Sequence, residues 1–204
     1  MNLTTKDREN LREIEMELNS VICPKSFYEL NNFPFKDIED LRESKNKDLI
    51  TLGITTHNFN LIYDYGKPSD INTHLIYLFL SIGLLFYVIG YAFYIGDNLY
   101  FLGIFSWAVG FGLTSPSCQS KSLIGVFLIL FIVSFFLFEI KYSWLLGVVI
   151  FTNLFTQTNR NITINSVVNN AIESEQLFTY LFKTKMLLSI KDNSNEVFLN
   201  PNDY

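Results

Sequence analysis

Few side chains in this 204-residue chain are suited to catalysis or to binding a metal. The sequence has two histidines, His57 and His74, and two cysteines in different regions, Cys23 and Cys118. A haem or metal site requires such ligands in matched positions, and acyl-transfer chemistry requires a nucleophile beside a histidine. No glycine-rich phosphate loop is present either. We therefore predict that the protein is not an enzyme and has no metal and no cofactor of its own.

Ionisable side chains are rare in the middle of the chain. Between residues 75 and 155 they are Asp97, Lys121, Glu139 and Lys141. Ionisable groups inside a membrane are costly and usually mark ion or proton paths. Asp97 and the Glu139/Lys141 pair lie at the ends of apolar runs, where water or lipid headgroups can solvate them. We expect interfacial charges at these positions rather than a proton relay.

These charges separate long apolar runs, and the runs determine the predicted fold. Uninterrupted apolar runs of about 18 residues or more indicate a helix that crosses a bilayer, and residues 75–95 meet that length. Runs at 99–114, 123–138 and 142–157 are shorter. We predict an all-α membrane protein with about four transmembrane helices in two hairpins, forming a block at 75–157. A re-entrant hairpin is the alternative for the short runs.

Orientation follows from the basic residues that flank the runs. Lys67, Lys121 and Arg160 fall on one face of a four-helix arrangement, and Lys141 falls on the other. Positively charged flanks stay on the cytoplasmic side, or on the equivalent matrix side of a mitochondrion. We therefore expect both termini on that side, with lipid bilayer around the block and bound lipid as a possible ligand.

Small residues recur at regular intervals in the first two runs. Gly83 and Gly90 are two helical turns apart in the first run, and Gly103 and Gly110 are equally spaced in the second, with Ser106 between them. In lipid, small residues on one stripe let two helix backbones approach closely. These five residues predict a tightly packed hairpin.

The same glycines carry a resemblance to a known family. The pattern from Gly83 through Phe86 to Gly90, with Asp97 in the following turn and the two later glycines, resembles the small tetraspan Golgi-transport proteins of vesicle traffic over about thirty residues. The resemblance implies a free-standing trafficking protein, which is one alternative for function. A bacterial membrane-disrupting effector is another.

The segment before the block, residues 1–74, is acidic and contains an amphipathic helix. Leu11, Ile14, Leu18 and Val21 recur at spacings of three and four, which places them on one apolar stripe. We expect this stripe to dock on a partner, because a narrow stripe is typical of a face that contacts another helix.

A second, short helix is expected within residues 36–50, with Leu41 and Leu49 facing inward, and a connector at 51–74. The apolar positions of this segment are too few for an independent core, so we expect it to lean on something else.

The polar tail, residues 158–204, is predicted to contain one helix. Asn165 or Ser166 can cap a helix that runs through residues 173–188. The end of the chain either continues as coil, which we favour, or closes a hairpin around 192–195.

Composition and charge narrow the function. The net charge is −5 and neither flank is basic, which argues against nucleic-acid binding. Phe and Tyr are abundant, with 20 and 11 residues, as in proteins encoded by AT-rich genomes. We predict a non-catalytic accessory subunit of a large membrane complex whose partners are other membrane-protein subunits. The favoured setting is a respiratory-chain or ATP synthase complex in the mitochondrial inner membrane of an AT-rich protist.

Overall fold

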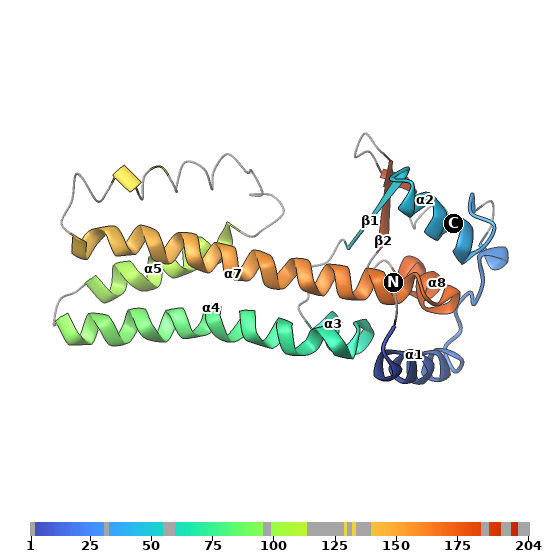
Figure 1. Cartoon of the computed structure of the whole chain (residues 1–204), viewed down its shortest axis with the longest axis horizontal. Coiled ribbons are helices and arrows are strands. Elements are labelled where there is room, and N and C mark those ends of the chain that lie inside the picture. The colour runs from blue at the N-terminus through green and yellow to red at the C-terminus, as the bar shows by residue number, and fades with distance from the viewer. Residues whose placement is uncertain are drawn as a thin grey trace. The chain divides into compact units, whose positions relative to one another are not determined.

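The chain divides into two compact units in a computed structural model (Figure 1). The terminal unit contains Met1–Asn72 and Asn161–Tyr204, and the helical unit contains Thr73–Arg160. The structure describes residues 3–30, 33–54, 60–95, 99–113, 129, 132–133, 140–184, 188–192 and 197–199. The sequence analysis treats 1–74 and 158–204 as separate segments, whereas the structure places both flanks in one unit.

The terminal unit begins with helix α1, Thr5–Leu18, which starts at a capping box. The Asp7 N–H donates to the Thr4 hydroxyl at 3.2 Å, and the Thr4 N–H donates to the Asp7 carboxylate at 3.2 Å. Two backbone donors that the first turn leaves unpaired are thereby satisfied. The local sequence at the start of the chain is sufficient to set this helix boundary.

The apolar stripe of α1 faces the chain's own core. Leu11, Ile14 and Leu18 are buried, and α1 packs against helix α8, Glu175–Lys183. The expected docking of this stripe on a partner is therefore corrected for these three residues. Val21 lies beyond the end of α1 and is 40% exposed, because the helix ends at Leu18 before the stripe reaches it.

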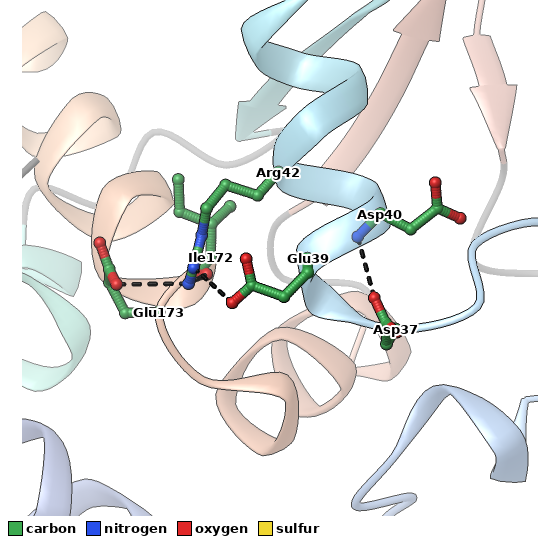
Figure 2. Close-up of polar contacts among 6 residues, drawn as sticks. All are labelled: Asp37, Glu39, Asp40, Arg42, Ile172 and Glu173. Atoms are coloured by element: carbon green, nitrogen blue, oxygen red, sulfur yellow. Dashed lines mark hydrogen bonds and ion pairs between the residues drawn. The ribbon is translucent and has the colours of Figure 1, made fainter.

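Helix α2, Ile38–Asn46, is the short second helix of the prediction. It is capped by Asp37, whose carboxylate accepts the Asp40 N–H at 2.9 Å (Figure 2). Leu41 is fully buried as expected, but Leu49 is 53% exposed. The inward position of Leu49 was wrong because the helix ends at Asn46 and Leu49 precedes a strand.

A three-stranded antiparallel sheet is the main departure from the all-α prediction. Strand β1, Ile50–Ile54, pairs with β2, Leu188–Asp192, which pairs with β3, Val197–Leu199. Leu52 lies opposite Ile190 in the β1–β2 register. The hairpin alternative for the tail was therefore right and the coil was wrong. The connector prediction missed β1 and the short helix α3, Leu61–Tyr65.

The core of the terminal unit is built largely from α8. This helix starts at Ser174, whose hydroxyl accepts the Leu177 N–H, and buries side chains from both of its turns. Phe178 contacts Phe27 edge to face at a centroid distance of 5.2 Å and stacks on Phe182 at 6.2 Å. The N-terminal segment thus leans on the C-terminal segment, which supplies the apolar surface that it lacks.

The helical unit is formed by α4, α5 and much of α7, which lie side by side (Figure 1). Their bounds are Pro68–Ile95, Leu99–Gly112 and Ile140–Ala171. Among the described residues, one helical stretch, Pro68–Tyr91, is long and apolar enough to cross a membrane, and Leu102–Gly112 is a shorter apolar helix. Most of the third predicted run lies outside the described residues, and the fourth is part of the longer α7. The chain is mostly helical, as expected, and the four-span arrangement stays a prediction.

Candidate functional site

The surface of α4 is apolar along most of its length. The 18-residue apolar window of this helix has a mean hydropathy of 1.9, yet only 17% of it is buried inside the chain. The core helix of a water-soluble protein would bury most of such a window. The large exposed side chains of α4 are Ile76, Phe79, Leu80, Ile82, Phe86, Tyr87, Phe93 and Tyr94.

In the part of helix α7 that belongs to the helical unit, several polar side chains are buried and several large apolar ones are exposed. A helix on the surface of a water-soluble protein shows the reverse pattern. Thr152 and Thr156 are buried, one helical turn apart, whereas Phe151 and Leu154 between and beside them are about half exposed. Polar side chains on α7 thus face the inside of the helical unit and aromatic or aliphatic ones face outward. Buried polar positions inside and apolar positions outside are expected where the surroundings are lipid.

The inward polar groups form what we call the polar seam, and they hydrogen-bond across helices. The hydroxyls of Ser81 and Thr156 are 3.2 Å apart, which joins α4 to α7. The Trp107 indole N–H donates to the Ser81 carbonyl at 2.9 Å, which joins α5 to α4. Asn153 donates its side-chain amide to the Gly110 carbonyl at 3.4 Å. The polar seam consists of Ser81, Ser143, Thr152, Asn153, Thr156 and Asn159.

Two hydroxyls of the polar seam are buried without a hydrogen-bond partner, those of Ser143 and Thr152. A buried hydroxyl that lacks a partner costs free energy of about 1–3 kcal/mol. None of the six seam residues is ionisable. His74, which is 1% exposed on α4, is a buried imidazole in the same unit.

The glycines of α5 lie where backbones meet. A side-chain carbon added at Gly110 would be 2.6 Å from the Val149 carbonyl oxygen and 2.9 Å from Cβ of Thr152, so α7 occupies that space. One added at Gly103 would overlap Val88 and would be 3.0 Å from the Trp144 ring. Both positions require glycine because helix α5 approaches its neighbours so closely there.

The glycines of α4 have no such role within the chain. A side-chain carbon at Gly83 or Gly90 would meet nothing within 4 Å, and both residues are exposed. The helix-packing expectation is corrected for these two, because α5 approaches α4 at Val88 and α7 at Trp144, Val149 and Thr152, whereas neither α4 glycine has a neighbour within 4 Å. Ser106, between the α5 glycines, is half-buried.

The predicted interfacial charges cannot be placed in the same way. Asp97 and Glu139 lie outside the described residues, and for Lys141 the structure describes only its backbone in α7. Among the described residues, no group of three or more His, Cys, Asp or Glu side chains is placed to hold a metal ion. The expectation of interfacial charges at these three positions stays a prediction.

Asp7 caps a helix in the terminal unit and also contacts a second helix, which the sequence alone does not indicate. Its carboxylate belongs to the α1 capping box and also accepts the Ser69 N–H at 3.1 Å, in the first turn of α4. Burial alone would raise its pKa, but hydrogen bonds from Thr4 and Ser69 outweigh it, so the pKa of Asp7 lies below its usual value. One carboxylate thus caps the beginnings of two helices.

Comparison of this chain with protein-family models, with curated proteins and with solved structures finds no match. The function must therefore be inferred from the polar seam and from the exposed apolar surface of α4. The signal for the seam is visible in the sequence, since Thr152, Thr156 and Asn159 recur at spacings of four and three within an apolar run.

Proposed function

We propose that the protein is a non-catalytic subunit of a larger membrane assembly, in which the helical unit lies in the bilayer. The observation that carries the proposal is that only 17% of the apolar window of α4 is buried within the chain. Large contiguous apolar surfaces are unstable in water and mark contact with lipid or with other subunits. The polar seam supports the same environment, since it puts hydrogen bonds inside and apolar groups outside.

The terminal unit is formed by both flanks of the helical unit, and this limits how many times the chain can cross a membrane. Strand β1 precedes the helical unit and pairs with β2, which follows it, and α1 likewise packs on α8. Strands cannot pair across a bilayer, so both flanks of the helical unit must lie on the same side. If α4 crosses, the number of crossings is therefore even. This supports two or four spans with both termini on one side of the membrane. The basic flanking residues Lys67, Lys121 and Arg160 favour the side equivalent to cytoplasm or matrix.

We place the assembly in the mitochondrial inner membrane, as an accessory part of a respiratory-chain or ATP synthase complex. The support is compositional: 20 Phe and 11 Tyr in 204 residues are typical of AT-rich coding. The polar seam adds support for a structural role, because its hydroxyl and amide groups make hydrogen bonds between helices. Isolation of the native complex from its source membrane and mass spectrometry of its subunits test this setting.

Membrane integration is tested first with the full chain. Membranes from expressing cells are washed with alkaline carbonate, and the protein is expected to stay in the pellet. Replacing both Phe79 and Phe86, each 67% exposed on α4, with lysine is expected to release much of it. Each charge at the bilayer centre costs about 2.5–3.5 kcal/mol on insertion scales. Tyr28→Lys, an exposed aromatic position of the terminal unit, is the matched control and should leave the protein in the pellet.

The assembly itself is tested in mild detergent. The protein is expected to migrate with other subunits on a native gel. When it is separated from them, it is expected to aggregate, or the amides of α4 are expected to lose their protection from hydrogen exchange. Release of the wild-type chain by carbonate would remove the membrane part of the proposal. A chain that is extracted as a stable, monodisperse single protein would remove the assembly part.

A further inference from the structure

Lys67 is a buried lysine at the start of the helix that we place in the membrane. It is 4% exposed and directly precedes Pro68, the first residue of α4. Its backbone N–H donates to the Ser166 hydroxyl at 2.8 Å, which holds this position against α7. Among the described residues, no hydrogen bond or ion pair is made by its ammonium group. Because Lys67 is largely enclosed and has no counter-charge within hydrogen-bond distance among the described residues, an anionic partner would stabilise it.

Lys45 is anchored on the same turn of α7. Its ammonium group donates to the Asn169 side-chain oxygen at 3.1 Å, and Asn169 lies three residues after Ser166. Residues three apart on a helix are neighbours on one face, so the anchors of the two lysines lie together. Burial lowers the pKa of Lys45, the positive charge of Lys67 lowers it further, and Glu173 opposes both. The two amines are thus close enough to repel each other.

The carboxylate that opposes the lowered pKa of Lys45, that of Glu173, already has a partner. Glu173 pairs with Arg42 at 3.3 Å, and Arg42 also donates to the Ile172 carbonyl at 2.6 Å and to Glu39 at 2.7 Å (Figure 2). Glu39 and Glu173 together balance Arg42 and one further positive charge. The sum over Arg42, Lys45, Lys67, Glu39 and Glu173 is still positive. An additional anion at this position would relieve the repulsion between the two lysines.

We propose that Lys45 and Lys67 bind a phosphate group, with their ammonium groups as the donors. A phosphate offers several acceptor oxygens, so it can take a hydrogen bond from each amine at once. The position at the beginning of an apolar helix favours the phosphodiester headgroup of an anionic lipid, because headgroups lie where such helices leave the bilayer. The same amines would accept free phosphate, and the two sources are separated by experiment. The site does not depend on what the helical unit assembles with.

The test uses the full-length protein purified in a neutral detergent. Its thermal midpoint is measured with inorganic phosphate, with phosphatidylglycerol and with phosphatidylcholine added to the micelles. Phosphatidylglycerol is expected to raise the midpoint by several degrees, because a ligand that binds only the folded state stabilises it. Phosphatidylcholine should have no such effect, since its own positive charge opposes the lysines. A shift by inorganic phosphate alone would identify free phosphate as the source.

Substitutions decide whether the two lysines form the site. Lys45→Met and Lys67→Met should each lower the affinity for the phosphate source that shifts the midpoint by about tenfold or more, because each removes a charge-assisted hydrogen bond. Lys47→Met is the matched control on the same helix, because Lys47 is exposed and pairs with Glu43 at 2.6 Å. Lys67→Arg should keep binding.

Failure to fold is distinguished from failure to bind by the midpoint without ligand. Because Lys67→Met removes a positive charge that repels Lys45, the ligand-free midpoint of this variant should be unchanged or higher. The proposal is overturned if neither phosphate source shifts the wild-type midpoint. It is also overturned if the shift persists in both methionine variants, or if Lys47→Met abolishes it equally.

Discussion

The two units of this protein are built with opposite polarity. In the terminal unit most of the buried side chains are apolar, with Phe178 and Phe182 fully enclosed, and Asp7 and Lys67 are the buried charged residues among those described. In the helical unit Thr152 and Thr156 are enclosed, and Phe79 and Phe86 are exposed. Most of the large apolar side chains named here are enclosed in the first unit and exposed in the second. This difference is what the proposed position of the helical unit in a bilayer leads us to expect.

The hydrogen bonds that join distant segments differ in the same sense. In the terminal unit several of them use charged side chains: the Ser174 hydroxyl donates to the Glu15 carboxylate at 2.5 Å, and Glu175 accepts the Phe27 N–H at 2.5 Å. In the helical unit the links through Ser81, Trp107 and the other seam residues use hydroxyls, an indole and an amide, none of which carries a charge. Uncharged links avoid the desolvation cost of an ion in lipid.

The largest effect should come from the core of the terminal unit. Phe178→Ala is expected to lower the free energy of unfolding of that unit by about 3–5 kcal/mol, because it leaves a cavity beside Phe27 and Phe182. Phe86→Ala, the same change at an exposed position of α4, should cost far less in detergent. Hydrogen exchange at the amides of α8 and α4 measures the two effects separately. Equal losses would contradict the opposite polarity of the units.

A smaller effect is expected where α5 meets α7. Gly110→Ala should destabilise the helical unit by about 1–3 kcal/mol, since the added carbon would be 2.6 Å from the Val149 carbonyl oxygen. Gly83→Ala has open space and should instead stabilise α4 by roughly 0.5–1 kcal/mol through helix propensity. Thermal unfolding followed by the fluorescence of Trp107 and Trp144 reports on this unit. A Gly83 variant that loses as much as the Gly110 variant would show that α4 has a close neighbour at that position.

The cap at Asp7 should give a pH-dependent effect of about 1–2 kcal/mol in the terminal unit. Hydrogen bonds to the charged form hold the folded-state pKa of Asp7 below the unfolded value of about 3.9. The ionised carboxylate therefore stabilises the fold above that value, and the contribution is lost as the pH falls through the folded-state pKa. Asp7→Asn should remove the contribution at neutral pH and approach the wild type in acid. Parallel stability curves for the two proteins across that range would argue against it.

The smallest effect is expected in the polar seam. A double-mutant cycle of Ser81→Ala and Thr156→Val should give a coupling of about 0.6 kcal/mol, typical of hydrogen bonds between membrane helices. Thr156→Val conserves the shape of the side chain, so cavity effects stay small. Unfolding in mixed micelles provides the measurement. A coupling of zero would mean that the 3.2 Å contact does not stabilise the unit.

Local patterns predicted local structure well. Leu11, Ile14 and Leu18 were correctly placed on one apolar face of a helix, because the helical period is carried by the residues themselves, but what covers that face was not predicted. Val21 failed because the sequence marks a helix end only approximately, and Leu49 failed for the same reason after α2. The apolar character of α4 was also evident, since hydropathy over a long window does not depend on partners.

What the sequence could not indicate was pairing over long separations. Strands β1 and β2 carry no mark of each other, so the joining of the two flanks and the short sheet were missed. The glycine stripe illustrates the same limit: equal spacing on α4 and α5 did not reveal that only Gly103 and Gly110 have close neighbours. Lys45 and Lys67 were likewise unremarkable until the fold anchored both on one turn of α7.

The pairing of β1 with β2 also sets the order of events while the chain is being made. Strand β1 is synthesised early, but its neighbour in the sheet emerges only after residues 55–187 have followed it. At about 5–20 residues per second, β1 waits on the order of ten seconds with its edge unpaired. The helical unit therefore leaves the ribosome before the sheet can close. A nascent chain arrested before residue 188 should expose β1 to proteases and to chaperones.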